Sequence, residues 1–327
     1  MVARVVATTH LPGDPARLLD GHTWIGPAAG EDAWPRARWL SELAHPETRA
    51  LVCLLSDPID GAALDTNPAL RVVANYAVGV DNVDLTAATA RDVAVANTPD
   101  VLVEASADFT FALLLAAARR LGEGERLVRA GAWRGWTPDL LLGAEVGGRT
   151  LGILGLGRIG RAVARRARGF GMTVLYTRGA PPGDVAATEV PLTELLAGSD
   201  FLSIHCPLTP ATRGLVDARA LAAMKPGAIL VNTARGAIVD EGALADALGR
   251  GHLGGAGLDV FTDEPQIDPR LLAAPRLVLA PHLGSATTSA RTRMAELCVT
   301  AVRDVLSGRR PANLVNGDAL AARGRAW

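Results

Sequence analysis

The chain has little cysteine and almost no net charge. Its three cysteines, Cys53, Cys206 and Cys298, lie far apart in apolar surroundings and form no Cys-x-x-Cys pair. Such usage is typical of a reducing compartment and predicts neither a disulfide nor a metal site. The formal net charge is −1, so the electrostatic footprint of a nucleic-acid or anionic-membrane partner is absent.

Long uninterrupted apolar runs are also missing. The longest, 109–118, is shorter than a membrane span and indicates a buried helix. The first ten residues lack a signal-peptide pattern, because 2–8 is strand-like and Pro12-Gly13 ends it. We therefore expect a soluble, cytoplasmic protein. With 327 residues, of which 49% are hydrophobic, two domains are the natural expectation.

The stretch 147–179 carries the strongest pattern in the chain. An apolar strand at 150–154 is followed by the glycine run Gly155-x-Gly157-x-x-Gly160, a helix and a second strand at 172–176. This order, within about 30 residues, is the context of a dinucleotide-binding fingerprint. Gly155 permits the tight turn, Gly157 lets the backbone approach a pyrophosphate, and Gly160 lets the helix lie close to the strand. The helix N-terminus then offers N–H groups to the anion. The alternative is a glycine turn that only packs a helix on a sheet.

Strands and helices alternate on both sides of this stretch. Short apolar strands are expected at 2–8, 50–55, 70–74 and 93–96, before a boundary at Pro99, and again at 201–204, 228–232, 254–258 and 277–280. Asp84 is a plausible N-cap of the helix 85–91, and Ser285 of a long helix 286–306. This alternation predicts an α/β protein with open parallel sheets. Ligands of such sheets bind at the carboxyl ends of the strands, which here are followed by the loops 233–236, 259–265 and 281–285.

Several long motifs in register resemble one known family. GILGLGRIG, HCPLTPATRGLV, LVNTARGAIVD, GLDVFTDEP and APHLGSAT occur in that order, and GVDNVD and NTPDVLVEASADFTFALLL precede them. Together they resemble the D-isomer-specific 2-hydroxyacid dehydrogenases over nearly all of 75–310. The resemblance implies two Rossmann-like doubly wound domains, with the cofactor domain (99–283) inserted into a substrate domain (1–98 and 284–327).

The same resemblance implies a catalytic set of Arg235, Glu264 and His282. A guanidinium suits the carboxylate or keto oxygen of a 2-keto acid, and a histidine can donate a proton near neutral pH. Glu264 would fix the imidazole tautomer and favour imidazolium. Taken singly, Arg235 also fits a surface charge at a helix edge, His282 a histidine with satisfied hydrogen bonds before a helix, and Glu264 a carboxylate of a loop.

Further positions follow from the family pattern. The backbone N–H groups of Val78 and Gly79, with Arg235 and His282, would hold the substrate carboxylate and keto group, and Asp259 would accept a hydrogen bond from the nicotinamide carboxamide. The expected cofactor contacts are Gly155, Gly157, Arg158, Ile159, Gly160, Thr177, Arg178, Cys206, Pro207, Thr212, Thr233, Ala234, Asp259, His282 and Gly284. Histidines 10, 22, 45, 205 and 252 are expected to be structural.

Departures from the family pattern narrow the substrate. Members acting on 3-phosphoglycerate tend to carry arginine where this chain has Asn75, and formate-oxidising members have glutamine in place of Glu264. The segments NTPDVLVEASAD, GAWRGWTP and YTR look most like glyoxylate and hydroxypyruvate reductases, although a usual threonine is Val103 here. The expected substrate is a small 2-keto acid, reduced to the D-2-hydroxy acid. The alternatives are another 2-hydroxyacid dehydrogenase, such as 3-phosphoglycerate dehydrogenase, or a cofactor-sensing corepressor or scaffold on the same fold.

Cofactor choice and assembly are two further expectations. The second strand ends in Thr177-Arg178-Gly179 and no acidic residue follows until Asp184. A carboxylate there would repel a 2′-phosphate, whereas Arg178 can pair with it, so NADP is expected to be preferred over NAD. Trp133, Trp136 and the apolar helix from Val103 predict a homodimer, as the resemblance does. The alternative is that both tryptophans are core residues of one subunit.

Overall fold

The computed structural model describes residues 2–327 and divides into two compact units. Unit 1 consists of Met1–Leu102 with Thr287–Trp327, and unit 2 of Val103–Ala286. The chain therefore leaves unit 1, forms unit 2 and returns to unit 1 with its last 41 residues, 287 to 327. The roles of these units as substrate domain and cofactor domain stay predictions.

Unit 1 contains a five-stranded parallel sheet. Its order is β2-β1-β3-β4-β5, with the strands β1 (Arg4–Ala7), β2 (Thr23–Ile25), β3 (Thr48–Cys53), β4 (Val72–Asn75) and β5 (Ala94–Ala96). The central strands are buried and apolar on both faces, as expected for a parallel sheet between helices.

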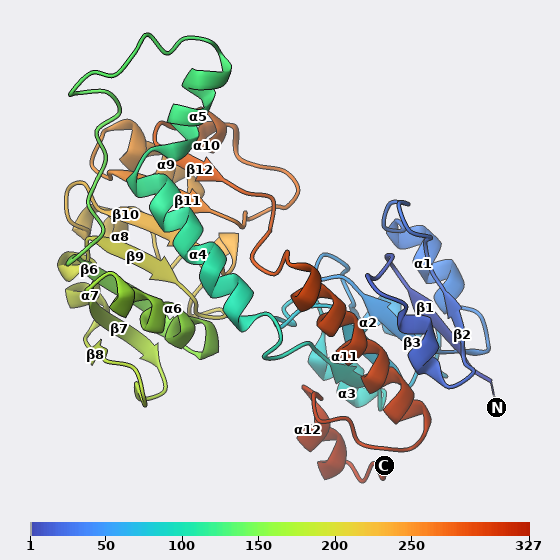
Figure 1. The fold of residues 1–327 in the computed structure, drawn as a ribbon. Coiled ribbons are helices and arrows are strands. Elements are labelled where there is room, and N and C mark those ends of the chain that lie inside the picture. The colour runs from blue at the N-terminus through green and yellow to red at the C-terminus, as the bar shows by residue number, and fades with distance from the viewer. Residues whose placement is uncertain (1) are drawn as a thin grey trace. The chain divides into compact units, whose positions relative to one another are not determined.

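Helices cover this sheet. They are η1 (Pro15–Leu19), α1 (Arg36–Leu43), α2 (Gly61–Asp65), α3 (Leu85–Ala90), α11 (Thr288–Leu306) and α12 (Gly317–Ala322). Side chains of α1, α2 and α3 share one core with Val6, Leu51 and Val95 of the sheet, whereas α11 contacts β3, β4 and β5 (Figure 1). Unit 1 thus depends on a helix from the far end of the chain.

Two capping predictions had different outcomes. The Asp84 side chain accepts from the Ala87 N–H at 2.8 Å and caps α3, as predicted. The prediction that Ser285 caps the last long helix is wrong, because α11 begins at Thr288 and Thr287 is its cap, accepting from the Ala290 N–H at 3.1 Å. The capping residue is the one directly before the first residue of the helix. That residue is Thr287, which lies two positions after Ser285.

Unit 2 is a seven-stranded parallel sheet of order β12-β11-β10-β9-β6-β7-β8. The strands are β6 (Thr150–Leu156), β7 (Thr173–Gly179), β8 (Thr188–Glu189), β9 (Phe201–Ile204), β10 (Ile229–Asn232), β11 (Gly255–Leu258) and β12 (Leu277–Leu279). After β8 the chain crosses to the other side of β6, so the strand order reverses between β6 and β9. The predicted fold class of doubly wound parallel sheets is confirmed for both units.

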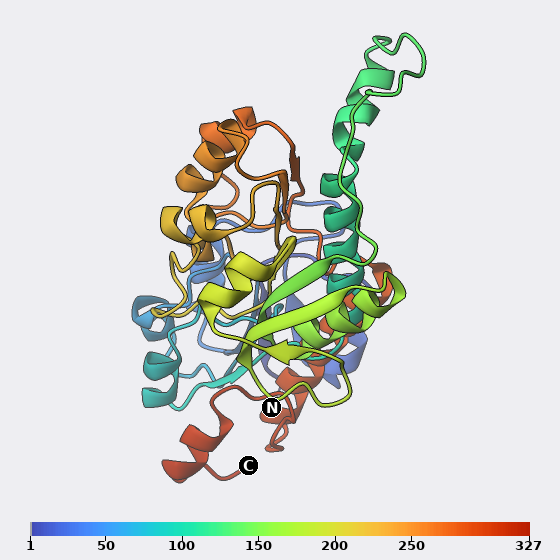
Figure 2. The same ribbon diagram turned by 90° about the vertical axis from the view of Figure 1, so that its left-hand side faces the viewer.

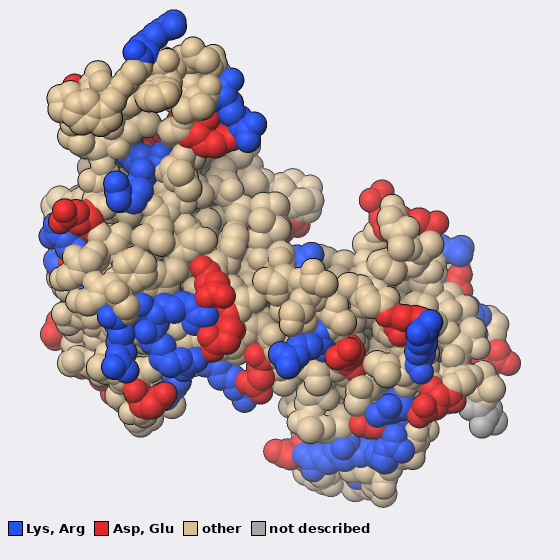
Figure 3. All heavy atoms as spheres, viewed as in Figure 1, with Lys and Arg blue, Asp and Glu red and all other residues tan. Residues whose placement is uncertain are grey.

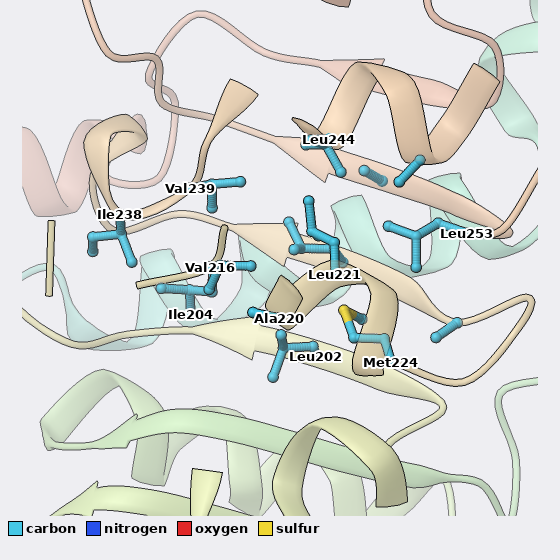
Figure 4. Close-up of a cluster of buried hydrophobic side chains, with 14 of the residues drawn as sticks. Leu202, Ile204, Val216, Ala220, Leu221, Met224, Ile238, Val239, Leu244 and Leu253 are labelled. Atoms are coloured by element: carbon cyan, nitrogen blue, oxygen red, sulfur yellow. The ribbon is translucent and has the colours of Figure 1, made fainter. Parts of the chain in front are cut away.

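Helices lie on both faces of this second sheet. They are α4 (Val103–Ala118), α5 (Leu121–Arg129), α6 (Arg158–Gly169), α7 (Leu192–Gly198), α8 (Ala218–Ala223), η2 (Gly236–Ile238), α9 (Glu241–Gly249) and α10 (Pro269–Ala273). On one face α4 and α6 pack on β6 and β7. On the other, Leu221 of α8, Met224 directly after α8 and Leu244 of α9 belong to one core with Leu202 of β9 (Figure 4).

A long arm extends from unit 2. It consists of α5 and the segment 130–145, and Figure 2 shows it projecting from the end of α4, away from the rest of this unit. No residue of α5 is buried, and residues 130–140 are all exposed. Trp133 and Trp136 expose 54% and 81% of their surface, so neither is a core residue of this subunit.

The charged surface is mixed rather than basic. Arginines of α6 appear as a blue group beside red residues in Figure 3, and Arg165 and Arg166 form ion pairs with Glu104 and Asp108 of α4. Within residues 2–327, no helix has the length and apolarity to cross a bilayer. The same residues include no group of three or more His, Cys, Asp or Glu side chains placed to hold a metal ion.

Candidate active site

The glycine turn between β6 and α6 has three distinct local environments. Gly155 has a φ of +105°, and a Cβ built on it would lie 2.5 Å from the Cys206 nitrogen. A Cβ on Gly160 would lie 2.3 Å from the Gly155 carbonyl oxygen. These two glycines are therefore required by the backbone itself, the first for conformation and contact and the second for helix packing.

Gly157 differs, because a Cβ there would meet no atom within 4 Å. It is the N-cap of α6, has extended backbone angles and has no side-chain cap. The first turn of this 12-residue helix, which begins at Arg158 and Ile159, therefore lacks a side-chain cap and lies at the point where the strand order reverses. That arrangement fits a dinucleotide pyrophosphate.

The carboxyl end of β7 bends sharply. Arg178 is an exposed residue with a φ of +60°, and Gly179 follows with a φ of +133°. A Cβ on Gly179 would lie 2.8 Å from the Leu156 nitrogen. Burial raises the pKa of the Cys206 thiol, and the positive charge of Arg178 opposes that rise. Arg178 and Thr177 thus stand at the same edge as the glycine turn.

The loop after β9 is held by its own hydroxyl groups. The buried Thr212 hydroxyl donates to the Pro207 carbonyl at 2.7 Å and accepts from the Thr209 N–H at 2.8 Å. His205 contacts the Ser203 hydroxyl through Nε2 at 2.7 Å, and burial lowers its pKa to about 3. Burial therefore disfavours the charged form of His205, and its ring contacts Ser203 at the end of β9.

The loop after β10 carries Arg235. The Asn232 side chain accepts from the Ala234 N–H at 3.0 Å and donates to the Arg235 carbonyl at 2.9 Å, which fixes the turn. The Thr233 hydroxyl lies 3.0 Å from that of Thr110 on α4. A Cβ on Gly236 would lie 2.0 Å from the Phe261 carbonyl carbon, so the loops after β10 and β11 touch.

Asp259, at the end of β11, is almost fully buried, with 1% of its surface exposed. Its two carboxylate oxygens accept from the N–H groups of Leu283 and Gly284 at 2.6 and 2.7 Å, and its carbonyl accepts from the His282 N–H at 2.9 Å. Burial raises the pKa of this carboxyl group, while the two backbone N–H groups oppose the rise. Three successive N–H groups around one acidic residue form an anion nest.

His282 and Glu264 form a hydrogen-bonded pair that links the loops after β12 and β11. His282 Nδ1 lies 2.8 Å from Glu264 Oε2, and Glu264 Oε1 accepts from the Phe261 N–H at 2.9 Å. Burial alone would raise the pKa of Glu264, but the hydrogen bond and charge of His282, with a further contribution from Arg235, lower it below its usual range. His282 has a φ of +55°, which the Asp259 nest holds in place.

Val78 and Gly79 belong to unit 1, in the loop that follows β4. Three successive carbonyl groups of this loop each accept a hydrogen bond. The Thr98 N–H donates to the Ala77 carbonyl at 2.9 Å, Asn97 Nδ2 to the Val78 carbonyl at 2.8 Å and Asn75 Nδ2 to the Gly79 carbonyl at 2.7 Å. In a planar trans peptide the N–H group points opposite to the carbonyl before it. The N–H groups of Val78 and Gly79 are therefore directed away from these donors.

The structure thus brings the predicted residues of unit 2 to one edge of its sheet, after β6, β7, β9, β10, β11 and β12. It also shows contacts that the sequence analysis missed. The Asp259 nest was not foreseen, although a buried acidic residue directly after a strand was its signal. Asn97 and Asn75 were not singled out as supports of the Val78 loop, and their positions after β5 and within β4 were the available clue.

Comparison with known proteins gives consistent matches. The family model described as D-isomer specific 2-hydroxyacid dehydrogenase, NAD binding domain, matches residues 111–284. The glyoxylate reductase of Korarchaeum cryptofilum is 50% identical over 329 residues, which cover 99% of this chain and 98% of that protein.

Solved structures give the same picture. A glyoxylate reductase from Paecilomyes thermophila is 32% identical, with a TM-score of 0.86 and coverage of 97% of this chain and 99% of that one. An NADPH-dependent glyoxylate/hydroxypyruvate reductase from Sinorhizobium meliloti, solved with NADP and malonate, is 34% identical, with a TM-score of 0.85 and coverage of 96% and 97%. The similarity in sequence and in fold therefore extends over both units.

Proposed function

This chain belongs to the D-isomer-specific 2-hydroxyacid dehydrogenase family and is an NAD(P)-dependent oxidoreductase, and we propose that it reduces a small 2-keto acid of the glyoxylate or hydroxypyruvate type to the D-2-hydroxy acid. The observation that carries the proposal is the His282–Glu264 pair, 2.8 Å apart, at the strand edge where Arg235 also lies. The names of similar proteins, glyoxylate reductase and glyoxylate/hydroxypyruvate reductase, support the substrate class.

The substrate carboxylate is assigned to the N–H groups of Val78 and Gly79 in unit 1. Their direction, away from the donors that hold the neighbouring carbonyls, leaves them available to an anion. Two adjacent backbone N–H groups bind a carboxylate without a formal positive charge. In unit 2 the Arg235 guanidinium is assigned to the carboxylate or keto oxygen, where it remains charged at any physiological pH.

His282 is assigned as the general acid in reduction. The reduced nicotinamide supplies the hydride that the keto carbon accepts. The keto oxygen gains a pair of electrons, and His282 Nε2 gives it a proton, because Nδ1 is occupied by Glu264. The ionised Glu264 orients the imidazole and stabilises its charged form before transfer. In the reverse direction the same nitrogen accepts the proton from the hydroxy acid.

The glycine turn, the open N-terminus of α6 and Arg178 are assigned to the cofactor. Its pyrophosphate fits the space beside Gly157, where a side chain is missing. Arg178 is exposed at the end of β7, and no acidic residue follows before Asp184. We therefore assign NADPH as the preferred cofactor, with the Arg178 guanidinium and the Thr177 hydroxyl on its 2′-phosphate.

The function is tested by measuring turnover of a panel of 2-keto acids with NADPH and NADH. The panel includes glyoxylate, hydroxypyruvate, pyruvate, a bulkier 2-keto acid and 3-phosphohydroxypyruvate. We expect turnover to be fastest with glyoxylate or hydroxypyruvate. Cofactor binding without turnover of any keto acid would contradict the proposal and favour a cofactor-sensing scaffold on the same fold.

We also assign a homodimer as the functional assembly. The arm exposes Leu121, Val128, Trp133, Trp136 and Leu142, each by more than half of its surface. An apolar surface of this kind on a soluble subunit marks an interaction site, and the protein family points to a second copy as the partner. Light scattering at micromolar concentration should give twice the chain mass of 33.9 kDa. A monomer mass would contradict the assignment.

A further inference from the structure

We propose that Asn97 positions the substrate-carboxylate loop and that the carboxy-terminal segment 313–316 holds Asn97 in place. The inference rests on the proposed role of the Val78 and Gly79 N–H groups. It assigns a function to the end of the chain, which lies in unit 1 and contributes no residue to the hydride-transfer chemistry.

Asn97 acts on the loop through one side-chain hydrogen bond. Its Nδ2 donates to the Val78 carbonyl at 2.8 Å. The Val78 carbonyl and the Gly79 N–H belong to the same peptide group, so the bond that holds the first sets the direction of the second. Asn97 is therefore a positioning residue for one of the two N–H groups assigned to the carboxylate.

Asn97 itself is held by the far end of the sequence. It follows β5, the edge strand of the sheet, where no further parallel strand is available to bind it. The Asn97 N–H donates to the Asn313 carbonyl at 3.2 Å, and Asn313 Nδ2 donates to the Asn97 carbonyl at 2.6 Å. Both backbone groups of Asn97 thus depend on one residue that lies 216 positions later in the chain.

The segment that carries Asn313 is anchored independently. The Val315 N–H donates to the Val95 carbonyl at 2.7 Å, and Asn316 exchanges two side-chain hydrogen bonds of 2.9 Å with the Val95 N–H and the Val93 carbonyl. Asn316 is 5% exposed. A single antiparallel bridge joins Leu314 to Ala96. The segment therefore closes the edge of β5 and fixes the position of Asn313.

Removing the Asn97 side chain frees the Val78 carbonyl, so the peptide between Val78 and Gly79 can rotate and the Gly79 N–H loses its direction. Carboxylate binding should weaken while proton and hydride transfer continue in the bound substrate. For Asn97→Ala we expect the KM of the keto acid to rise about tenfold, the scale of one charge-assisted hydrogen bond. The kcat should stay within about twofold, and the KM of the cofactor should not change.

Asn67→Ala is the matched control. Asn67 is also an asparagine of unit 1 that holds backbone carbonyls: it is buried, and its Nδ2 donates to the Leu43 and Thr48 carbonyls at 2.8 and 3.0 Å. It precedes the amino end of β4, whereas the Val78 loop follows the carboxyl end of that strand. A purely structural role would lower the melting temperature in both variants and leave both KM values alone. An unchanged KM in Asn97→Ala, or an equal rise in Asn67→Ala, would overturn the inference.

Asn313→Ala tests the second step. We expect a smaller rise in keto-acid KM, about three- to fivefold on the same scale, and no further rise when it is combined with Asn97→Ala, because Asn313 acts only through Asn97. Additive effects in the double variant would contradict the proposed link.

Hydrogen exchange separates this inference from the proposed function. Asn313→Ala removes the side-chain bond to the Asn97 carbonyl but keeps the backbone carbonyl that accepts from the Asn97 N–H. Loss of the side-chain bond should loosen Asn97, so exchange of the Asn97 and Thr98 N–H groups should accelerate in Asn313→Ala and stay unchanged in Asn67→Ala. That measurement needs no substrate. If the parent protein reduces no keto acid, the proposed function fails, but hydrogen exchange still decides whether segment 313–316 holds Asn97. Equal exchange rates in the parent and in Asn313→Ala would contradict that role of the segment.

Discussion

Both units contain a parallel sheet in which the strand order reverses once, yet the two reversal points differ in what fills them. In unit 2 the reversal lies between β6 and β9, and Gly157 there faces open space. In unit 1 it lies between β1 and β3, where the Thr8 hydroxyl donates to Asp57 Oδ2 at 2.5 Å. The reversal point of unit 2 is open because Gly157 has no side chain. The reversal point of unit 1 is filled by the hydrogen-bonded pair Thr8–Asp57.

The difference shows that strand topology offers a ligand position and side chains decide whether it is used. With its reversal point closed, unit 1 presents its candidate anion-binding N–H groups at the neighbouring strand β4, in the loop of Val78 and Gly79. Unit 2 presents a helix N-terminus at its open reversal point. Its His282–Glu264 pair follows β11 and β12, at the carboxyl ends of strands in the same sheet. Each of the following predictions tests one side of this contrast.

The largest effect is expected from His282→Ala. Loss of the general acid should lower kcat by about 10²- to 10⁴-fold, while cofactor binding, measured by fluorescence titration, is retained. Thr8→Val is the control at the closed reversal point: it removes a buried hydrogen bond but no reacting group, and kcat should stay within about twofold. An unchanged kcat in His282→Ala would contradict the role of His282 in proton transfer.

A pair of glycine variants should separate binding from stability. Gly157→Val places a side chain in open space and should weaken NADPH binding about tenfold or more with an unchanged melting temperature. Gly160→Ala forces a Cβ against the Gly155 carbonyl, 2.3 Å away, and should cost about 1–3 kcal/mol of folding free energy. Calorimetric titration and thermal unfolding measure the two quantities; a stability loss in Gly157→Val would show that the space is not open.

Arg178→Ala should change cofactor preference. Loss of a charge-assisted bond to the 2′-phosphate is expected to lower kcat/KM with NADPH about tenfold and to leave kcat/KM with NADH unchanged. Arg158→Ala, at the first residue of the fingerprint helix, is the comparison for a general loss of positive charge and should affect both cofactors alike. Equal kcat/KM for NADPH and NADH in the parent enzyme would refute the preference.

The smallest effect is expected at the closed point. Burial raises the pKa of Asp57 above its usual range, despite hydrogen bonds from Thr8 and Leu54. The folded state therefore binds this proton more tightly than the unfolded state, so the group contributes less stability as pH rises through the raised pKa. Asp57→Asn keeps an oxygen for both donors and removes the charge. Its melting temperature at pH 8 should rise by about 2 °C or less, and the gain should vanish near pH 4. A lower melting temperature at pH 8 would mean that the charge itself stabilises the closed point.

Much of the fold follows from local patterns. The alternation of apolar strands and helices, the glycine turn and the Asp84 cap depend on neighbours within a few residues, and the structure places them where the sequence predicts. The helix α5 buries no residue, so no contact with the core identifies it. Its short sequence also contains Gly122 and Gly124, which disfavour a helix. The two-residue strand β8 is exposed and too short for any alternation to appear.

The site is predictable in its residues and less so in its supports. Motif order placed Arg235, Glu264 and His282 together, and the contact of the last two is what the structure records. The Asp259 nest needs two loops after different strands to meet, and the Asn97–Asn313 contact needs residues 216 positions apart to meet. No local pattern encodes such pairs, because tertiary packing brings them together.

The discontinuity of unit 1 has a consequence for the order of events during synthesis. All residues of unit 2 have been made once the ribosome passes Ala286, whereas the sheet of unit 1 still lacks α11 and the segment that closes β5. At about 5–20 residues per second, the last 41 residues, 287 to 327, need a further 2 to 8 seconds or so. During that interval the nascent chain carries a unit 2 with its complete sequence, while the sheet of unit 1 still lacks the helix and the closing segment that complete it.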